Sequence, residues 1–193
     1  MTEDELTNIE WARQREALFA KEAAELELER KRVLTELNGR LWHTTHPDRF
    51  TSILTSHAIL PEPSIPDGER SFTGGGKEHY PYVRTLGGVS LFDFDQFDPD
   101  TYHDKCPGCT WAEFVPYRIK WGCSVWIEID RAQVAPRLIS GLDLVAKQWS
   151  DEALGHMIMP YIEAAYLGPL PRTAFKRAFL VRKDDSQFHP LEC

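Results

Sequence analysis

Two polar side chains stand at the ends of short apolar runs, far apart in the sequence, and both could act on a sugar. His43 follows Leu41 and Trp42, and Glu163 opens an otherwise apolar run that ends at Gly168. A carboxylate at the mouth of an apolar strand is costly to bury unless it is paired or faces solvent. In glycoside cleavage a carboxylate stabilises the positive charge that develops on the sugar ring. We therefore expect His43 and Glu163 to face one cleft and to grip a ribose from two sides.

The two motifs resemble the first and last signature motifs of the ADP-ribosyltransferases, and their order is closest to the DarT-like branch. The first reads Leu41-Trp42-His43-Thr44-Thr45 and is followed by a short helical segment. The last reads Glu163, an aliphatic run and Gly168-Pro169-Leu170-Pro171. The resemblance covers most of residues 40–182. It implies an α+β domain of two small packed mixed or antiparallel sheets with an NAD cleft, in which ADP-ribose is transferred from NAD and nicotinamide is released.

The resemblance also implies roles for individual residues. Glu163 would stabilise the oxocarbenium-like ribose, and His43 would hydrogen-bond a ribose hydroxyl while Thr44 or Thr45 supports its loop. Many relatives carry a serine or tyrosine on a middle strand that lines the nicotinamide pocket, which here corresponds to Ser90. Some use an arginine near the NAD phosphates or the acceptor, which here corresponds to Arg84. The expected site is therefore Glu163, His43, Thr44, Thr45, Ser90 and Arg84.

Residue types alone leave other interpretations of these positions open. Phe92 or Phe94 could stack on nicotinamide, because an aromatic face suits a flat ring. Ser90 could belong to an ordinary core strand, and Glu163 could be an exposed glutamate on an edge strand. A protein that binds a nucleotide in the same fold without catalysis is a further alternative.

The sequence does not identify the acceptor of the ADP-ribose group. DarT-like enzymes carry an Asn- and Ala-rich element before the final strand that helps to form a DNA-binding face, whereas residues 148–153 here read Gln-Trp-Ser-Asp-Glu-Ala. The net charge of −8 also argues against general affinity for a nucleic-acid backbone. A protein, a nucleic acid or a small molecule therefore stays open as the acceptor, as does plain hydrolysis of NAD. A toxin is one biological setting that the resemblance implies.

A cysteine motif suggests a function of a different class. Cys106 and Cys109 form a C-x2-C knuckle, with His103 before it and Cys123 after it. Three thiolates and an imidazole could hold zinc, although a second C-x2-C is missing and Cys123 could be a small buried strand residue. The alternative to a transferase is thus a non-catalytic zinc-knuckle interaction module with a partner-binding N-terminal helix.

Composition bounds the class of protein. A chain of 193 residues with 42% hydrophobic and 27% charged residues fits one domain with an appendage and can bury a core. No apolar run approaches the roughly 20 residues of a membrane helix, and the start of the chain is acidic, unlike a signal peptide. These features predict a cytoplasmic protein without a membrane segment, and therefore cysteines that are reduced or bound to metal.

The N-terminal region predicts one long helix. Residues 3–38 contain no glycine or proline and are rich in helix formers, and Gly39 is a plausible end. We therefore expect a helix over residues 1–38 and the ADP-ribosyltransferase-like domain over residues 39–193. The helix could lie solvated along the domain, or bind a partner or a second copy. We expect it to be dispensable for nucleotide binding.

The rest of the chain predicts short elements around a long loop. Proline and the triple glycine at residues 74–76 predict a loop over residues 61–79, which is either a linker or a mobile segment that closes on a ligand. Elsewhere we expect strands over residues 83–94, 121–129, 162–167 and 178–182, a turn-helix capped by Asp130, and a helix over residues 150–159.

Overall fold

The fold is that of a computed structural model, which describes residues 3–70, 73, 75–95 and 97–193. Gly74 of the triple glycine lies outside the described residues. The chain divides into two compact units, Met1–Glu36 and Leu37–Cys193, close to the predicted boundary after residue 38. Within the described ranges, no helix is both long and apolar enough to cross a membrane.

The N-terminal unit is helical throughout its described part. Helix α1 spans Glu3–Leu37, and the chain leaves it at Gly39, whose φ of 73° suits glycine. Charged residues pair along the helix surface at helical spacing, such as Lys21 with Glu25 and Arg32 with Glu29. Large apolar side chains are also exposed on it, including Trp11, Leu18, Phe19 and Leu28.

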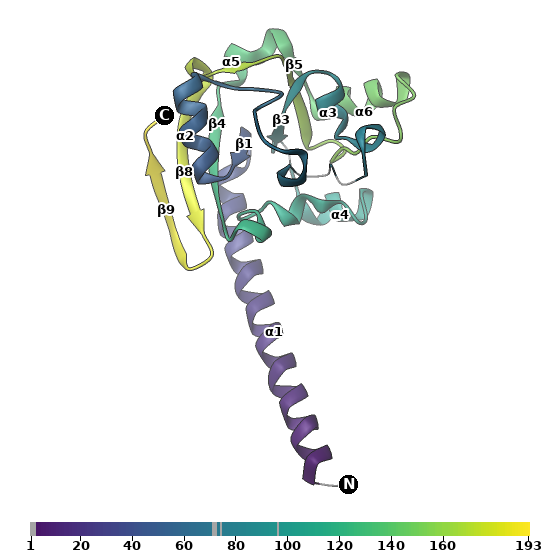
Figure 1. Cartoon of the computed structure of the whole chain (residues 1–193), viewed down its shortest axis with the longest axis vertical. Coiled ribbons are helices and arrows are strands. Elements are labelled where there is room, and N and C mark those ends of the chain that lie inside the picture. The colour runs from purple at the N-terminus through teal and green to yellow at the C-terminus, as the bar shows by residue number, and fades with distance from the viewer. Residues whose placement is uncertain (1–2, 71–72, 74, 96) are drawn as a thin grey trace. The chain divides into compact units, whose positions relative to one another are not determined.

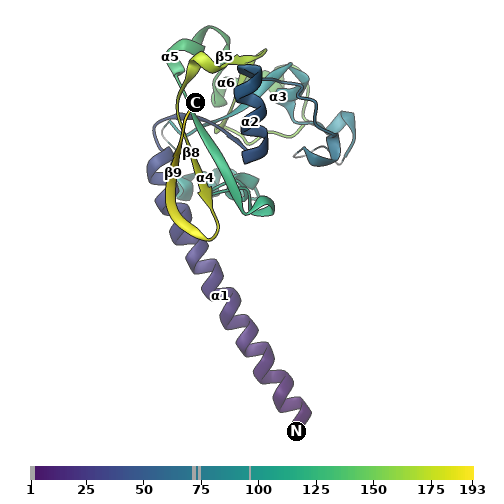
Figure 2. The same cartoon turned by 60° about the vertical axis from the view of Figure 1, so that its left-hand side comes forward.

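The second unit is built on a seven-stranded antiparallel sheet. Its strand order is β5-β6-β3-β1-β4-β8-β9, and a separate two-stranded sheet pairs β2 with β7. The strands span Leu41–Thr45 (β1), Ala58–Ile59 (β2), Gly88–Asp93 (β3), Cys123–Ile129 (β4), Leu138–Ile139 (β5), Glu163–Leu167 (β6), Leu170–Pro171 (β7), Phe175–Arg182 (β8) and Asp185–Leu191 (β9). Figures 1 and 2 show the β8–β9 hairpin in yellow, with β9 at the edge of the sheet. The α+β class with antiparallel sheets is confirmed, but one large and one very small sheet replace the two small sheets that we expected.

Short helices connect the strands. They span Pro47–Ser56 (α2), Tyr82–Thr85 (α3), Pro99–Lys105 (α4), Arg131–Val134 (α5) and Gly141–Ser150 (α6). The Asp130 side chain caps α5 as predicted, by accepting from the backbone N–H of Ala132 and Gln133. The helix predicted over residues 150–159 is wrong, because Ser140 supplies the N-cap ten residues earlier and Ser150 ends α6.

Two further differences concern the strands. The strand expected over residues 83–94 begins only at Gly88, because α3 precedes it and Gly87 turns the chain with a φ of 64°. The two-residue strands β2, β5 and β7 and the longer strand β9 were not predicted. Strand β9 contains Pro190, a residue that suits an edge strand because it cannot donate to a sheet ladder.

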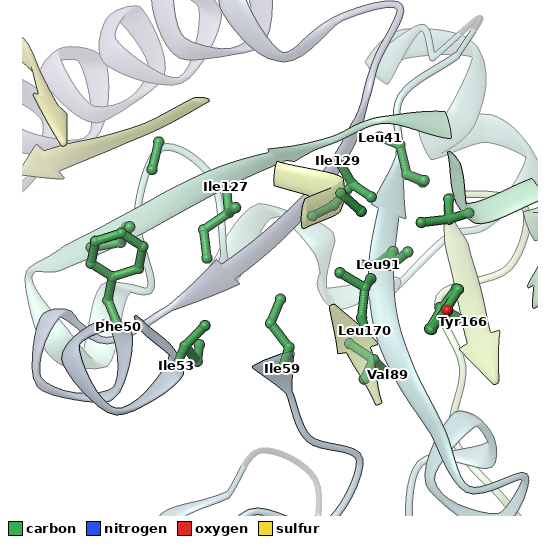
Figure 3. Packing of buried hydrophobic residues seen from close by; sticks show 14 of the residues in the cluster. Leu41, Phe50, Ile53, Ile59, Val89, Leu91, Ile127, Ile129, Tyr166 and Leu170 are labelled. Atoms are coloured by element: carbon green, nitrogen blue, oxygen red, sulfur yellow. The ribbon is translucent and has the colours of Figure 1, made fainter. Parts of the chain in front are cut away.

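The main core lies on one face of the large sheet. Leu41, Leu91 and Ile127 come from the three central strands, and Phe50 and Ile53 of α2 pack with them. Figure 3 shows this packing, with Ile59 and Leu170 of the small sheet in the same cluster. Burial of this face fixes the register of the central strands, since a slip by one residue would turn every side chain to the other face.

The central strands β1 and β3 separate after a short paired stretch. They pair only at Leu41–Asp93 and Trp42–Phe92, whereas β1 pairs with β4 along all five of its residues. His43 is the first residue of β1 beyond the last pair with β3. The sheet therefore opens beside His43.

Candidate functional site

All six residues of the expected site line one cavity. The cavity has a volume of about 450 Å³, and His43, Thr44, Thr45, Arg84, Ser90 and Glu163 are among its lining residues. This volume lies in the range of ordinary small-molecule sites. Part of the 61–79 loop, including Pro61, Ile65 and Arg70, also lines it. Side chains from β1, β3 and β6 thus meet on one cavity with a loop between residues 61 and 79.

Glu163 is buried at the start of β6, where both of its carboxylate oxygens accept hydrogen bonds. Its Oε1 accepts from the Ser90 hydroxyl at 2.6 Å, and its Oε2 accepts from the Met159 backbone N–H at 2.9 Å. Burial raises the pKa of Glu163, and the two hydrogen bonds act in the opposite direction. The side chain is therefore not an exposed edge-strand glutamate but a fixed carboxyl group in a poorly hydrated place.

His43 is held by the backbone of the same serine. Its Nδ1 lies 3.0 Å from the Ser90 carbonyl oxygen. A carbonyl can only accept, so Nδ1 carries the proton. Burial lowers the pKa of His43, and the bond to Ser90 only partly offsets this effect. The imidazole is thus neutral at pH 7, and its Nε2 presents a lone pair that can accept a hydrogen bond.

The two threonines after His43 differ in their surroundings. Thr45 is buried and lies opposite Val125 of β4. The Thr44 hydroxyl oxygen is inaccessible to solvent and has no hydrogen-bond partner among the described residues. An unpaired buried hydroxyl is costly, so Thr44 is the residue on β1 that most needs an additional partner.

Arg84 lines the cavity but is engaged by two carboxylates. Its Nε donates to Glu62 Oε1 at 2.6 Å, and its Nη1 donates to Asp67 Oδ1 at 2.9 Å. The guanidinium also lies 4.0 Å from the centre of the Tyr80 ring. These contacts tie α3 to the 61–79 loop, and the predicted role of Arg84 at the NAD phosphates stays a prediction.

The two phenylalanines considered as stacking residues stack on each other, with ring centroids 5.5 Å apart, but only one of them lines the cavity. Phe92 lines the cavity and lies opposite Glu163 across β3 and β6. Phe94 is fully buried behind Phe92, packs also with Phe97 and Trp126, and does not line the cavity. Phe92 is therefore the one of the two that a ligand in the cavity could touch.

Several cavity residues were not predicted from the sequence, among them Arg49 and Trp121. Arg49 projects from α2, and its guanidinium lies 5.4 Å from the ring centre of Trp121, which also lines the cavity. Arg49 follows His43 by six residues and lies in the helical segment that belongs to the same motif. Its place in that motif could therefore have nominated it as a site residue. Trp121 comes from a distant segment, and only the fold brings it to Arg49.

The four residues of the hypothesised zinc site do not form a ligand cluster. Cys106 and Cys109 lie just after α4, whereas Cys123 begins β4 and packs against the main core. No group of three or more potential metal ligands occurs within the part of the chain that the structure describes. The Cys109 thiol instead lies 3.0 Å from the Tyr102 hydroxyl.

Comparison with protein-family models and with curated proteins finds no match to this chain. The geometry of the site and the resemblance of the two motifs are therefore the observations that bear on its function.

Proposed function

We propose that the chain is an NAD-dependent ADP-ribosyltransferase, which moves ADP-ribose to a macromolecular acceptor and releases nicotinamide. One observation carries the proposal. The buried carboxyl of Glu163 is held by two hydrogen bonds on a cavity that His43 also lines, and Ser90 contacts both side chains. A buried carboxylate that is fixed in position suits the stabilisation of a cation that exists only during the reaction.

The reaction needs a negative charge beside the ribose, and Glu163 is the residue that would supply it. The bond between the ribose C1′ and the nicotinamide nitrogen breaks, and its electron pair goes to the nitrogen, which neutralises the pyridinium. Positive charge then develops on the ribose, as in glycoside cleavage. The ionised carboxylate stabilises this charge strongly because little water screens it in a buried site. An acceptor nucleophile attacks C1′ and loses its proton to solvent, and plain hydrolysis would follow the same course with water.

His43 contributes through the nitrogen that the protein leaves uncommitted. Since Nδ1 donates to the Ser90 carbonyl, Nε2 can accept from a ribose hydroxyl. A hydrogen bond of this kind holds the ribose in both ground and transition states, so it supports binding more than rate. His43 and Glu163 therefore have separable roles.

The experiment is to incubate the full chain with NAD and to measure nicotinamide by chromatography, with and without acceptors. The acceptors are single-stranded DNA, RNA and a protein extract, and mass spectrometry of each detects added ADP-ribose. We expect nicotinamide release that increases with one acceptor class, together with ADP-ribose on that acceptor. Absence of both NAD binding and nicotinamide release would contradict the proposal. Binding without release would favour a nucleotide-binding protein that is not an enzyme.

A further inference from the structure

Three arginines line the cavity, but the charges of two of them are balanced within the fold. Arg70 donates to Glu62 Oε2 at 2.6 Å and to the Pro61 carbonyl at 2.9 Å. Arg84 contacts both carboxylate oxygens of Glu62 and also Asp67. Two arginines and two carboxylates thus form a neutral cluster in which bidentate geometry already uses the guanidinium donors.

The third arginine, Arg49, keeps most of its donors unused. Its Nη2 donates to the Glu69 carbonyl at 3.0 Å, and the Glu69 carboxylate lies farther away, at 3.7 Å. The Glu69 side chain is 64% exposed, so solvent screens this pair. Nε and Nη1 of Arg49 have no hydrogen-bond partner among the residues that the structure describes. Arg49 is therefore the cavity arginine with the least balanced charge.

The surroundings of Arg49 fix its guanidinium and add a second donor. The Trp121 ring lies against the guanidinium, and His46 packs edge-on against the same ring, with centroids 5.5 Å apart. Ser52 follows Arg49 by three positions on α2, which places the two residues on the same side of the helix. Both line the cavity. The α2 wall therefore offers the cavity a planar cation and a hydroxyl.

We propose that Arg49, assisted by Ser52, binds the diphosphate of the dinucleotide, and that the Arg70–Arg84 cluster fixes the loop rather than the phosphates. This inference rests on the proposed use of NAD. A planar guanidinium whose Nε and Nη1 are uncommitted matches phosphate oxygens in pairs, which an ammonium group does not. The ligand would then extend from Glu163 and Ser90 to the α2 wall.

The test compares ligands with and without a diphosphate. Calorimetry measures the affinities of wild type, Arg49→Gln and Arg49→Lys for NAD, ADP-ribose and nicotinamide riboside, which has no phosphate. Arg182→Gln is the control because Arg182 is exposed and does not line the cavity, while the change in net charge is the same. We expect Arg49→Gln to bind NAD and ADP-ribose about tenfold to a hundredfold more weakly and the riboside unchanged. Arg49→Lys should recover only part of this loss.

The outcomes separate this inference from the proposed function. Unchanged affinity of Arg49→Gln for ADP-ribose, or an equal loss for all three ligands, would overturn the diphosphate role. Wild type that binds ADP-ribose but never releases nicotinamide would contradict the transferase, and the Arg49→Gln affinities would still decide the diphosphate role. Wild type that binds neither NAD nor ADP-ribose would overturn both. Circular dichroism confirms that each variant is folded.

Discussion

The Ser90 hydroxyl donates a hydrogen bond to Oε1 of Glu163 at 2.6 Å, which connects β3 to the start of β6. The two residues are diagonal neighbours in the ladder, because Ser90 pairs with Ala165 and Glu163 pairs with Phe92. The carbonyl of the same serine accepts from His43. Ser90 therefore positions both residues to which the proposed reaction assigns a role.

Ser90→Ala should move the acid limb of nicotinamide release to higher pH. The hydroxyl favours the ionised form of Glu163, so its removal raises the already raised pKa of Glu163 further. Since turnover needs the carboxylate, kcat should begin to fall at a higher pH than in wild type, with a loss of about tenfold on the acid limb. Ser90→Thr, which keeps a hydroxyl, is the matched control. A loss of kcat that is equal at every pH would mean that Ser90 only supports the fold.

His43→Asn separates the two nitrogens of the imidazole. The asparagine amide can still donate to the Ser90 carbonyl in place of Nδ1, but nothing replaces Nε2. We expect a folded protein whose affinity for NAD is about threefold to tenfold lower, with a smaller change in kcat. His43→Ala should also lower the free energy of unfolding, because it leaves the Ser90 carbonyl without its partner. An affinity of His43→Asn for NAD equal to that of wild type would contradict the proposed contact between His43 and the ribose.

Glu163→Gln should stabilise the fold at neutral pH. Burial raises the pKa of Glu163, so the native state holds its proton more tightly than the unfolded state. The stability that this tighter proton binding contributes is fully present below the unfolded-state pKa of about 4.3. It is lost as the pH rises through the folded-state pKa of Glu163. The amide carries no charge to bury, so its advantage should be largest at neutral pH and should shrink below about pH 4. Denaturant unfolding across this range measures the difference, and a variant less stable than wild type at pH 7 would count against it.

Gly141→Ala should destabilise the segment that leads to Glu163. A Cβ at Gly141 would lie 2.0 Å from the carbonyl oxygen of Tyr161, although alanine normally favours a helix. Overpacking against backbone costs about 1–3 kcal/mol of the free energy of unfolding, and we expect turnover to fall with it. Gly68→Ala is the control, since a Cβ there meets no atom within 4 Å. Equal stabilities of the two variants would show that the segment adapts freely.

The sequence predicted those parts of the fold in which a local pattern decides the structure. Strand β4 alternates and is rich in β-branched residues, and Asp130 carries its own capping signal. The α6 helix was misplaced because Ser150 and Ser140 offer similar N-caps, and only burial of Leu144 and Gln148 distinguishes them. No local pattern marked β9, since edge pairing with β8 stabilises it rather than its own composition.

The candidate site was predictable only as residues and not as contacts. The two motifs nominated His43 and Glu163, and their common cavity agrees with the expectation that they face one cleft. The ion pairs of Arg84 depend on Glu62 and Asp67, which follow no spacing rule because loop geometry brings them there. The stacking of Arg49 on Trp121 likewise arises only in the fold.

The most direct test is steady-state nicotinamide release by Glu163→Gln, with NAD affinity measured by calorimetry in parallel. The amide can accept from the Met159 N–H and donate to Ser90, so the side chain keeps its place and loses only its charge. Because that charge matters mainly in the transition state, we predict about a hundredfold or greater loss of kcat with near-normal NAD affinity. Wild-type-like release by the Gln variant would contradict the assignment of Glu163 and, with it, the central reason to regard this chain as a transferase.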